Sequence, residues 1–197
     1  MEVKNDIFTV RHNSAPLAKG CALIAEPFMK GFCFRRAVVL LAEHSSVSTL
    51  GLVLNKPLHI MLNEIYPSMN FAYPLPLFIG GPVQPKRLFF VHTLGDIIPG
   101  AKKISDSLYI GGNMHYVFTH LRKREDAIPS VKFFAGYSGW IPNQLKAEVD
   151  EDSWLVSRLS VDNIMTANDE NFWQSSLAAM GRKYQIWSHY PTTPRLN

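Results

Sequence analysis

Histidine is the residue type in this sequence that most readily suggests a metal site or acid–base chemistry, and it occurs at positions 12, 44, 59, 92, 115, 120 and 189. His115 and His120 share one helical segment, but a spacing of five residues points them in different directions. Glu43 and His44 are sequence neighbours, and neighbours on an extended chain face opposite ways. These spacings therefore predict no metal site and no acid–base pair.

Serine and glycine motifs give no stronger catalytic signal. Ser138 lies in the run Gly136–Gly139, which is one residue short of the Gly-x-Ser-x-Gly elbow of serine hydrolases. The pairs Gly80-Gly81 and Gly111-Gly112 could offer backbone N–H groups to an anion. A phosphate-binding loop also needs a Lys-Ser/Thr pair, which neither pair has. We therefore assign no catalytic residues and no cofactor, and lean towards a protein that is not an enzyme.

The two cysteines, Cys21 and Cys33, match no zinc or redox spacing, and both are expected to be free thiols. We expect both thiols to be buried and inert. The alternative is a functional thiol at Cys33, whose pKa Arg35 and Arg36 could lower. The net charge is +4, but the cations are scattered as singles and pairs. Nucleic-acid binding is not expected from such a pattern. The acidic residues within 148–152 are left without a role.

The elements that must position these residues follow from hydrophobic patterning. Apolar runs predict strands at 20–25, 36–42, 51–54, 75–79, 87–93, 103–104, 108–110, 131–134 and 154–159. Helical spacing predicts helices at 60–66, 114–124, from 142, 161–166 and 170–180. The polar turn 43–49 makes 36–42 and 51–54 an antiparallel hairpin. Alternation in 87–93 places Leu88 and Phe90 on one face, with Phe89 and Val91 on the other.

The stretch 132–154 is the most informative part of the chain. It reads as a strand, a tight turn at Gly136–Gly139 and a helix that begins near Pro142. We expect one packed cluster, to which four residues contribute (Trp140, Leu145, Val149 and Trp154). A turn so rich in glycine and aromatic residues could bind a ligand or form a rigid corner of the core, and we prefer the corner.

With 197 residues and 47% hydrophobic content, the chain can form one compact domain with a sizeable core. We expect an α+β fold with a mixed, largely antiparallel β-sheet and flanking helices. Residues 1–17 are assigned to an N-terminal tail or arm and residues 18–197 to the domain. No apolar run is long enough for a signal peptide or a membrane span, so a cytoplasmic protein is expected.

Several strand ends carry residues that allow a close approach of backbone or offer polar groups. We predict that these residues lie together as a binding surface, with His44 apart from them: Asn55, Lys56, Gly80, Gly81, Tyr137, Ser138 and Trp140. The alternative is that the glycines satisfy turn geometry at separate corners.

Seven short motifs occur in a characteristic order: GCALIAEPF, FRRAVVLLAEH, GLVLNKPL, FIGGPVQPKRLFFVH, LYIGG, FFAGYSGWIPNQLKAEV and YPTTPRLN. In this order the chain resembles the AlgH/YqgE family of bacterial proteins over about residues 18–197. The resemblance implies a single-domain α+β fold with no established catalytic site or cofactor, and some members carry the label of a transcriptional regulator. Asn113 and Asn143 depart from the family pattern, which commonly has Asp and Gly there.

Three functional hypotheses remain, in order of preference. The first is a non-enzymatic regulatory or interaction protein that binds another protein or a small molecule. The second is a hydrolase or transferase that uses the loops Gly80–Val83 and Gly136–Trp140. The third is a DNA-binding regulator, which requires one continuous basic face.

Overall fold

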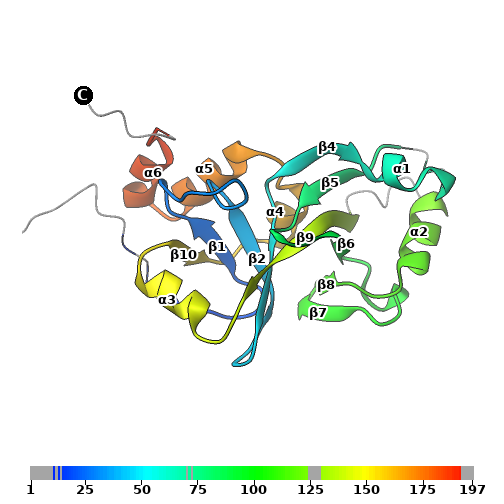
Figure 1. Cartoon of the computed structure of the whole chain (residues 1–197), viewed down its shortest axis with the longest axis horizontal. Helices are drawn as coiled ribbons and strands as arrows, with labels where there is room; N and C mark the ends of the chain where they lie inside the picture. Colours follow the sequence, from blue (N-terminus) through cyan, green and yellow to red (C-terminus); the bar gives the residue numbers. More distant parts are fainter. Residues whose placement is uncertain are drawn as a thin grey trace, which may run out of the picture.

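The computed structural model describes residues 11, 13, 15–69, 71, 73–123 and 130–191, and Figure 1 shows their arrangement. The strands are β1 (Ala22–Ala25), β2 (Val38–His44), β3 (Thr49–Val53), β4 (Pro57–Met61), β5 (Pro76–Ile79), β6 (Val83–His92), β7 (Lys102–Ser105), β8 (Leu108–Ile110), β9 (Val131–Trp140) and β10 (Trp154–Ser157). The helices are α1 (Leu62–Ile65), α2 (Met114–Lys123), α3 (Gln144–Asp150), α4 (Val161–Thr166), α5 (Glu170–Ala179) and α6 (Arg182–Ser188), with 3-10 turns at Pro67–Met69 and Gly95–Ile97.

The strands form one curved mixed sheet in the order β10-β1-β2-β3-β9-β6-β8-β7. Strand β5 lies off this path, where it pairs parallel with β9 and antiparallel with the edge strand β4. The remaining strand pairs are antiparallel. The α+β fold with a largely antiparallel mixed sheet, predicted from the sequence, is confirmed.

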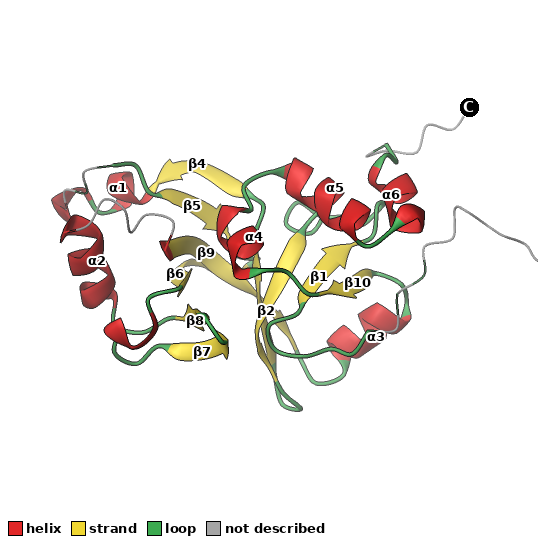
Figure 2. Ribbon diagram, turned by 180° about the vertical axis from the view of Figure 1, so that it is seen from behind, coloured by secondary structure: helices red, strands yellow, loops and turns green. Residues whose placement is uncertain are grey.

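Both faces of the sheet are covered, because alternate residues of the buried strands point to opposite sides. Helices α4, α5 and α6 cover one face of β1 and β2, and the turned view of Figure 2 shows them in front of these strands. Helix α3 covers the other face, over Trp140 and Trp154. Helix α2 closes a third cluster against β5, β6 and β9. The predicted alternation in β6 is confirmed, since Leu88 and Phe90 join the α2 cluster while Phe89 and Val91 face the other side.

Strand β9 joins the two halves of the sheet, and here the predicted glycine turn is wrong. The strand runs on through Gly136 and Gly139 to Trp140, so residues 136–139 form no turn. Gly136 has φ +70 and faces the backbone of the β5–β6 connection. A Cβ at this position would lie 2.7 Å from the Gly81 oxygen and 2.8 Å from the Val83 oxygen. Glycine is therefore needed because another segment approaches closely.

Other boundaries also differ from the sequence prediction. Glu43 and His44 lie inside β2, so the hairpin turn is confined to residues 45–48. Residues 57–61 form β4 in place of the predicted first turn of a helix, because they pair with β5. Helix α6 was not predicted, and Gly181, expected to end α5, also caps the start of α6. Most of the predicted N-terminal tail lies outside the described residues, but Asn13 bonds both backbone groups of Val156 on the edge strand β10.

Candidate functional site

Asn55, which the sequence placed on a binding surface, is buried between β2 and α5. Its side-chain oxygen accepts the Val38 N–H at 2.9 Å. Its amide nitrogen donates to the carbonyl oxygens of Arg36 at 3.0 Å and Asp169 at 3.1 Å. These bonds join the start of β2 to the start of α5, so the side chain has a structural contact at each of its polar atoms.

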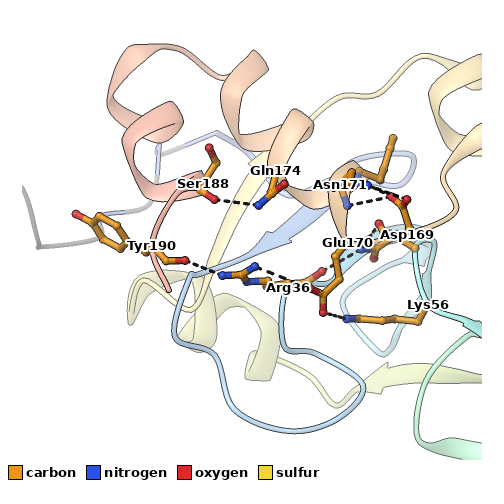
Figure 3. A network of polar contacts seen from close by, with 10 residues as sticks. Arg36, Lys56, Asp169, Glu170, Asn171, Gln174, Ser188 and Tyr190 are labelled. Carbon is orange, nitrogen blue, oxygen red and sulfur yellow. Dashed lines mark hydrogen bonds and ion pairs between the residues drawn. The ribbon is translucent and has the colours of Figure 1, made fainter. Parts of the chain in front are cut away.

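Lys56 and Arg36 flank the Glu170 carboxylate, as Figure 3 shows. Lys56 Nζ lies 3.4 Å from Glu170 Oε1, and Arg36 Nη1 lies 3.9 Å from Glu170 Oε2. Arg36 is 9% exposed, donates from Nη2 to the Tyr190 carbonyl at 2.6 Å, and lies 5.0 Å from the centre of the Trp173 ring. Its Nε has no hydrogen-bond partner. The network fixes α5 and the end of α6 to the loop before β2.

Gly80 and Gly81 lie against β9. The Gly80 carbonyl accepts the Val53 N–H at 2.9 Å and the Ser138 hydroxyl at 3.2 Å. A Cβ at Gly81 would lie 2.3 Å from the Tyr137 carbonyl carbon, so a side chain has no space there. The segments that carry the predicted site residues thus meet through their backbones, while Ser138 and both glycines are buried.

Trp140 lies on the opposite side of the sheet, under α3. It packs with Leu145, Val149 and Trp154 in one cluster, which confirms that prediction. Glu148 accepts the indole N–H of both tryptophans at 2.8 Å. Part of the unexplained acidic run therefore has a structural role beneath α3.

The positions of Trp140, Lys56 and Tyr137 also bear on the predicted binding surface. Trp140 pairs in register with Thr49, whose hydroxyl is 2.7 Å from His44 Nδ1, so Trp140 lies towards the His44 end of the β2–β3 hairpin. Lys56 is at the far end of the same hairpin. Tyr137 is half-buried and lines a groove described next. Ligand binding by the seven residues stays a prediction.

A groove of about 440 Å³ crosses the sheet beside Tyr137, and we call it the β6–β8 groove. Its sides come from β2, β3, β6, β7, β8, β9 and the residues just before α2. This volume falls within the range of small-molecule sites, about 300–1,000 Å³. The groove therefore collects side chains that are far apart in the sequence.

The floor of the β6–β8 groove is aromatic. The rings of Phe89 and Tyr137 are half-buried, with centres 5.3 Å apart and planes inclined at 54°. Leu50 extends the apolar surface beside them. The Arg87 guanidinium lies 5.1 Å from the centre of the Phe89 ring, a cation–π distance.

The rim of the groove is charged. Arg87 is exposed, and within the described ranges no carboxylate lies in salt-bridge contact with it. Lys102 Nζ is 2.9 Å from Glu43 Oε1, and the two side chains are 74% and 41% exposed. Two cations thus face one carboxylate, which leaves the rim with one positive charge in excess.

One wall of the groove is formed by Gly111 and Gly112, which precede α2. A Cβ on Gly112 would lie 2.7 Å from the Ile98 side chain, so this wall must lack a side chain there. The His92 ring supports this wall through a hydrogen bond. Its Nε2 lies 3.1 Å from the Gly111 carbonyl oxygen, and its Nδ1 accepts the Leu94 N–H at 3.3 Å. Burial lowers the pKa of His92, which favours the neutral ring that can make both bonds.

A second groove, of about 580 Å³, lies between residues 15–17, the β2–β3 turn and α3. Its chemical feature is the contact between His44 and the Thr49 hydroxyl. A nucleophile–base pair is oriented by a third group, commonly a carboxylate. In the described part of the chain no carboxylate bonds His44. This second groove therefore offers no complete catalytic arrangement.

Lys132 is a buried amine that sequence reasoning missed. Its Nζ donates to the carbonyl oxygens of Ile164, at 3.2 Å, and Ala167, at the end of α4, and it lies 4.2 Å from the centre of the Phe78 ring. Desolvation lowers the pKa of Lys132 from 10.5 to about 7. Neither groove includes Lys132, and its contacts fasten α4 to the sheet.

The described residues support neither a metal site nor a reactive thiol. Within the described ranges, no group of three His, Cys, Asp or Glu residues could hold a metal ion. Cys21 and Cys33 are free thiols, as predicted. Burial raises the pKa of Cys33 and outweighs the opposing charge of Lys56, which argues against the alternative in which neighbouring arginines activate this thiol. No described helix is long and apolar enough to cross a membrane.

Comparisons with known proteins give one consistent result. The profile of the AlgH-like family matches residues 22–185. A UPF0301 protein from Parabacteroides distasonis is 42% identical over 193 residues, which cover 98% of each chain. Another from Bacteroides thetaiotaomicron is 36% identical over 197 residues, which cover 100% of each chain.

Two solved structures share the fold. The crystal structure of protein DIP2367 from Corynebacterium diphtheriae has a TM-score of 0.73 and 22% identity, and the match covers 92% of this chain and 95% of that one. The solution structure of the AlgH protein from Pseudomonas aeruginosa has a TM-score of 0.68 and 24% identity, with 92% and 99% covered.

Proposed function

Because this chain belongs to the AlgH-like family, and the names of its relatives state no activity, we propose a function from its own geometry. The protein binds a small ligand in the β6–β8 groove and carries out no reaction on it. Membership of the family confirms the resemblance found in the order of the sequence motifs.

One observation carries this proposal: an aromatic floor lies beside a cation that has no carboxylate partner in the described chain. Phe89 and Tyr137 are half-buried and line the groove, and the Arg87 guanidinium lies over the Phe89 ring. Small-molecule sites combine apolar walls with a few polar groups in this way. A purely structural surface has no need of an apolar hollow next to a guanidinium whose described polar contact is Gln84 Oε1, at 3.4 Å, and not a carboxylate.

A binding role is favoured over catalysis by the chemistry of the groove. The titratable groups on its rim are Glu43, Arg87 and Lys102, and the groove brings no serine, cysteine or histidine side chain to them. The loops that the alternative hydrolase or transferase would use lie backbone against backbone, with the Gly80 N–H bonded to Ala135 at 2.9 Å. A reaction there would need a space that these contacts fill.

We also propose that the protein acts in the cytoplasm. Its two cysteines are unpaired, and disulfides are rare where thiols are kept reduced. A role as a regulator that responds to its bound ligand fits this location. A DNA-binding role is less favoured, because three of the described lysines, Lys56, Lys102 and Lys103, each lie in contact with a carboxylate and so add less to a continuous basic face.

The experiment uses the neutral apolar probe N-phenyl-1-naphthylamine, whose fluorescence rises on binding. The full chain should bind the probe saturably, and Tyr137→Ala should weaken binding by about tenfold, since stacking on an aromatic residue contributes about 1–3 kcal/mol. Tyr116→Ala is the matched control, because Tyr116 is exposed on α2 and does not line the groove. Thermal unfolding establishes that both variants fold. Equal probe binding by folded Tyr137→Ala and by the wild type would overturn the proposal.

A further inference from the structure

The β6–β8 groove combines three kinds of chemistry within one hollow, and together they specify a class of ligand. We propose that the ligand is a nucleoside phosphate: a flat heteroaromatic ring, an anionic group, and hydroxyl or amino donors on one small molecule. This inference rests on the proposed function, because it names the ligand of the same groove.

The ring would bind on the floor. The Phe89 and Tyr137 rings are in contact, with planes inclined at 54°, and both residues line the hollow. Bases stack on aromatic side chains with little preference for their identity, because every base has an aromatic face. Arg87, already 5.1 Å from the centre of the Phe89 ring, adds a planar cation that can stack against the same ligand or contact its anion.

The phosphate would bind at the cationic rim. Arg87 is exposed and has no carboxylate partner in the described part of the chain. Its Nη1 lies 3.4 Å from Gln84 Oε1, and its other N–H groups can donate to a phosphate. Lys102 on β7 lies on the same rim and provides a second cation. Since Glu43 neutralises one of the two charges, the net positive charge of the rim favours an anion over a neutral ligand.

The glycine wall allows a phosphate to approach the backbone. Gly111 and Gly112 have φ +67 and +106 and present no side chain to the groove. They precede α2, a helix of ten residues whose first turn carries positive partial charge. The Asn113 side-chain oxygen already accepts the His115 N–H. The glycine wall therefore adds to the cation site and does not form a phosphate site by itself.

The Glu43 carboxylate favours a nucleotide over a simple aromatic acid as the ligand of this groove. Glu43 is an acceptor in a groove that otherwise favours anions, and a carboxylate repels a ligand that is only anionic. A ligand that also carries donors can bond it. A nucleoside phosphate has ribose hydroxyl groups and, on most bases, an amino group, so it meets the ring floor, the cations and the acceptor together.

The test compares nucleoside 5′-monophosphates, each measured alone by calorimetry, with their own nucleosides and with inorganic phosphate. At least one monophosphate should bind about tenfold more tightly than its nucleoside, because a hydrogen bond to a charged group contributes about that factor. Arg87→Met should remove this tenfold advantage of the monophosphate over its nucleoside. Lys86→Met is the matched control, since Lys86 is the neighbouring exposed cation outside the groove, and it should change neither affinity.

Several results would overturn the inference: no monophosphate binds, nucleoside and monophosphate bind equally, Arg87→Met has no effect, or phosphate alone binds as tightly as the monophosphate. If the neutral probe still binds in a Tyr137-dependent way, the proposed function is supported and only the assignment of the ligand class is refuted. If the probe does not bind either, both the function and the ligand class are refuted. A pentaadenylate arm identifies the source: Arg87-dependent binding of the monophosphate supports a free nucleotide, and Arg87-dependent binding of the oligomer alone overturns the inference and points to RNA instead.

Discussion

Lys132 gives a sharp test of how this fold tolerates a buried amine. In the folded protein its pKa is lowered from 10.5 to about 7 by desolvation, a change that corresponds to about 5 kcal/mol. Below pH 7 the amine is protonated in both the folded and the unfolded states, so the full cost of burying the charge applies. Between pH 7 and 10.5 the unfolded state binds the extra proton, and stability therefore rises with pH.

The perturbation is Lys132→Met, which removes the titrating group while keeping a long apolar side chain. The free energy of unfolding of the wild type minus that of the variant should rise by about 2 kcal/mol between pH 7 and pH 9. Other groups titrate in both proteins and cancel in this difference. The variant also leaves the Ile164 and Ala167 carbonyls without their donor, which changes the absolute difference and not its dependence on pH.

Urea unfolding at pH 6, 7, 8 and 9 measures this difference. Lys19→Met is the matched control, because Lys19 also donates to a backbone carbonyl but is exposed. A wild-type-minus-variant difference that stays flat from pH 7 to pH 9 for Lys132→Met would refute the reasoning. It would mean that the amine is hydrated or paired in the folded state.

Three further predictions concern packing, charge and thiol chemistry. Trp140→Ala should lower the free energy of unfolding in urea by about 3–5 kcal/mol, as for other buried aromatics, and a loss below about 1 kcal/mol would contradict its placement under α3. Arg36→Met should destabilise the protein by about 1–3 kcal/mol, since the Tyr190 carbonyl loses its donor. Amide hydrogen exchange in α6 should also become faster. Unchanged protection of α6 would argue against this contact. Cys21 and Cys33 should together take up two alkyl groups under denaturing, non-reducing conditions. In the native protein, Cys33 should react slowly at pH 7, because burial raises its pKa. Labelling of Cys33 as fast as that of a free thiol would contradict its burial.

The sequence was sufficient where the signal is local. Alternation along β6 assigned Phe89 and Val91 to one face and Leu88 and Phe90 to the other, because side chains on a strand have a fixed period of two. The β2–β3 hairpin followed from two apolar runs joined by a short polar segment. Such patterns depend on neighbours along the chain and need no knowledge of distant segments.

The glycines of β9 show where local reasoning fails. The sequence predicts that Gly136 is part of a turn, yet its small size is required by the approach of Gly81 from the β5–β6 connection. The same applies to Lys132: a lysine between Val131 and Phe133 gives no sign that the end of α4 will cover it. In both cases the decisive contact comes from a residue remote in sequence.

The groove was beyond the reach of the sequence for the same reason. Arg87, Lys102 and Glu43 belong to three strands, and only the folded sheet brings them to one rim around Tyr137. Of the seven predicted surface residues, Tyr137 alone lines this groove. Its selection came from the density of glycine and aromatic residues around it, although the expected turn is absent there.

The measurement that tests the central claim most directly is an amide chemical-shift map by NMR, recorded during titration with N-phenyl-1-naphthylamine and then with a nucleoside monophosphate. The largest shifts should fall on Phe89, Gly111, Gly112 and Tyr137, which surround the β6–β8 groove. Shifts centred instead on Ile141 and the start of α3, beside the second groove, would contradict the claim that the ligand binds between β6 and β8.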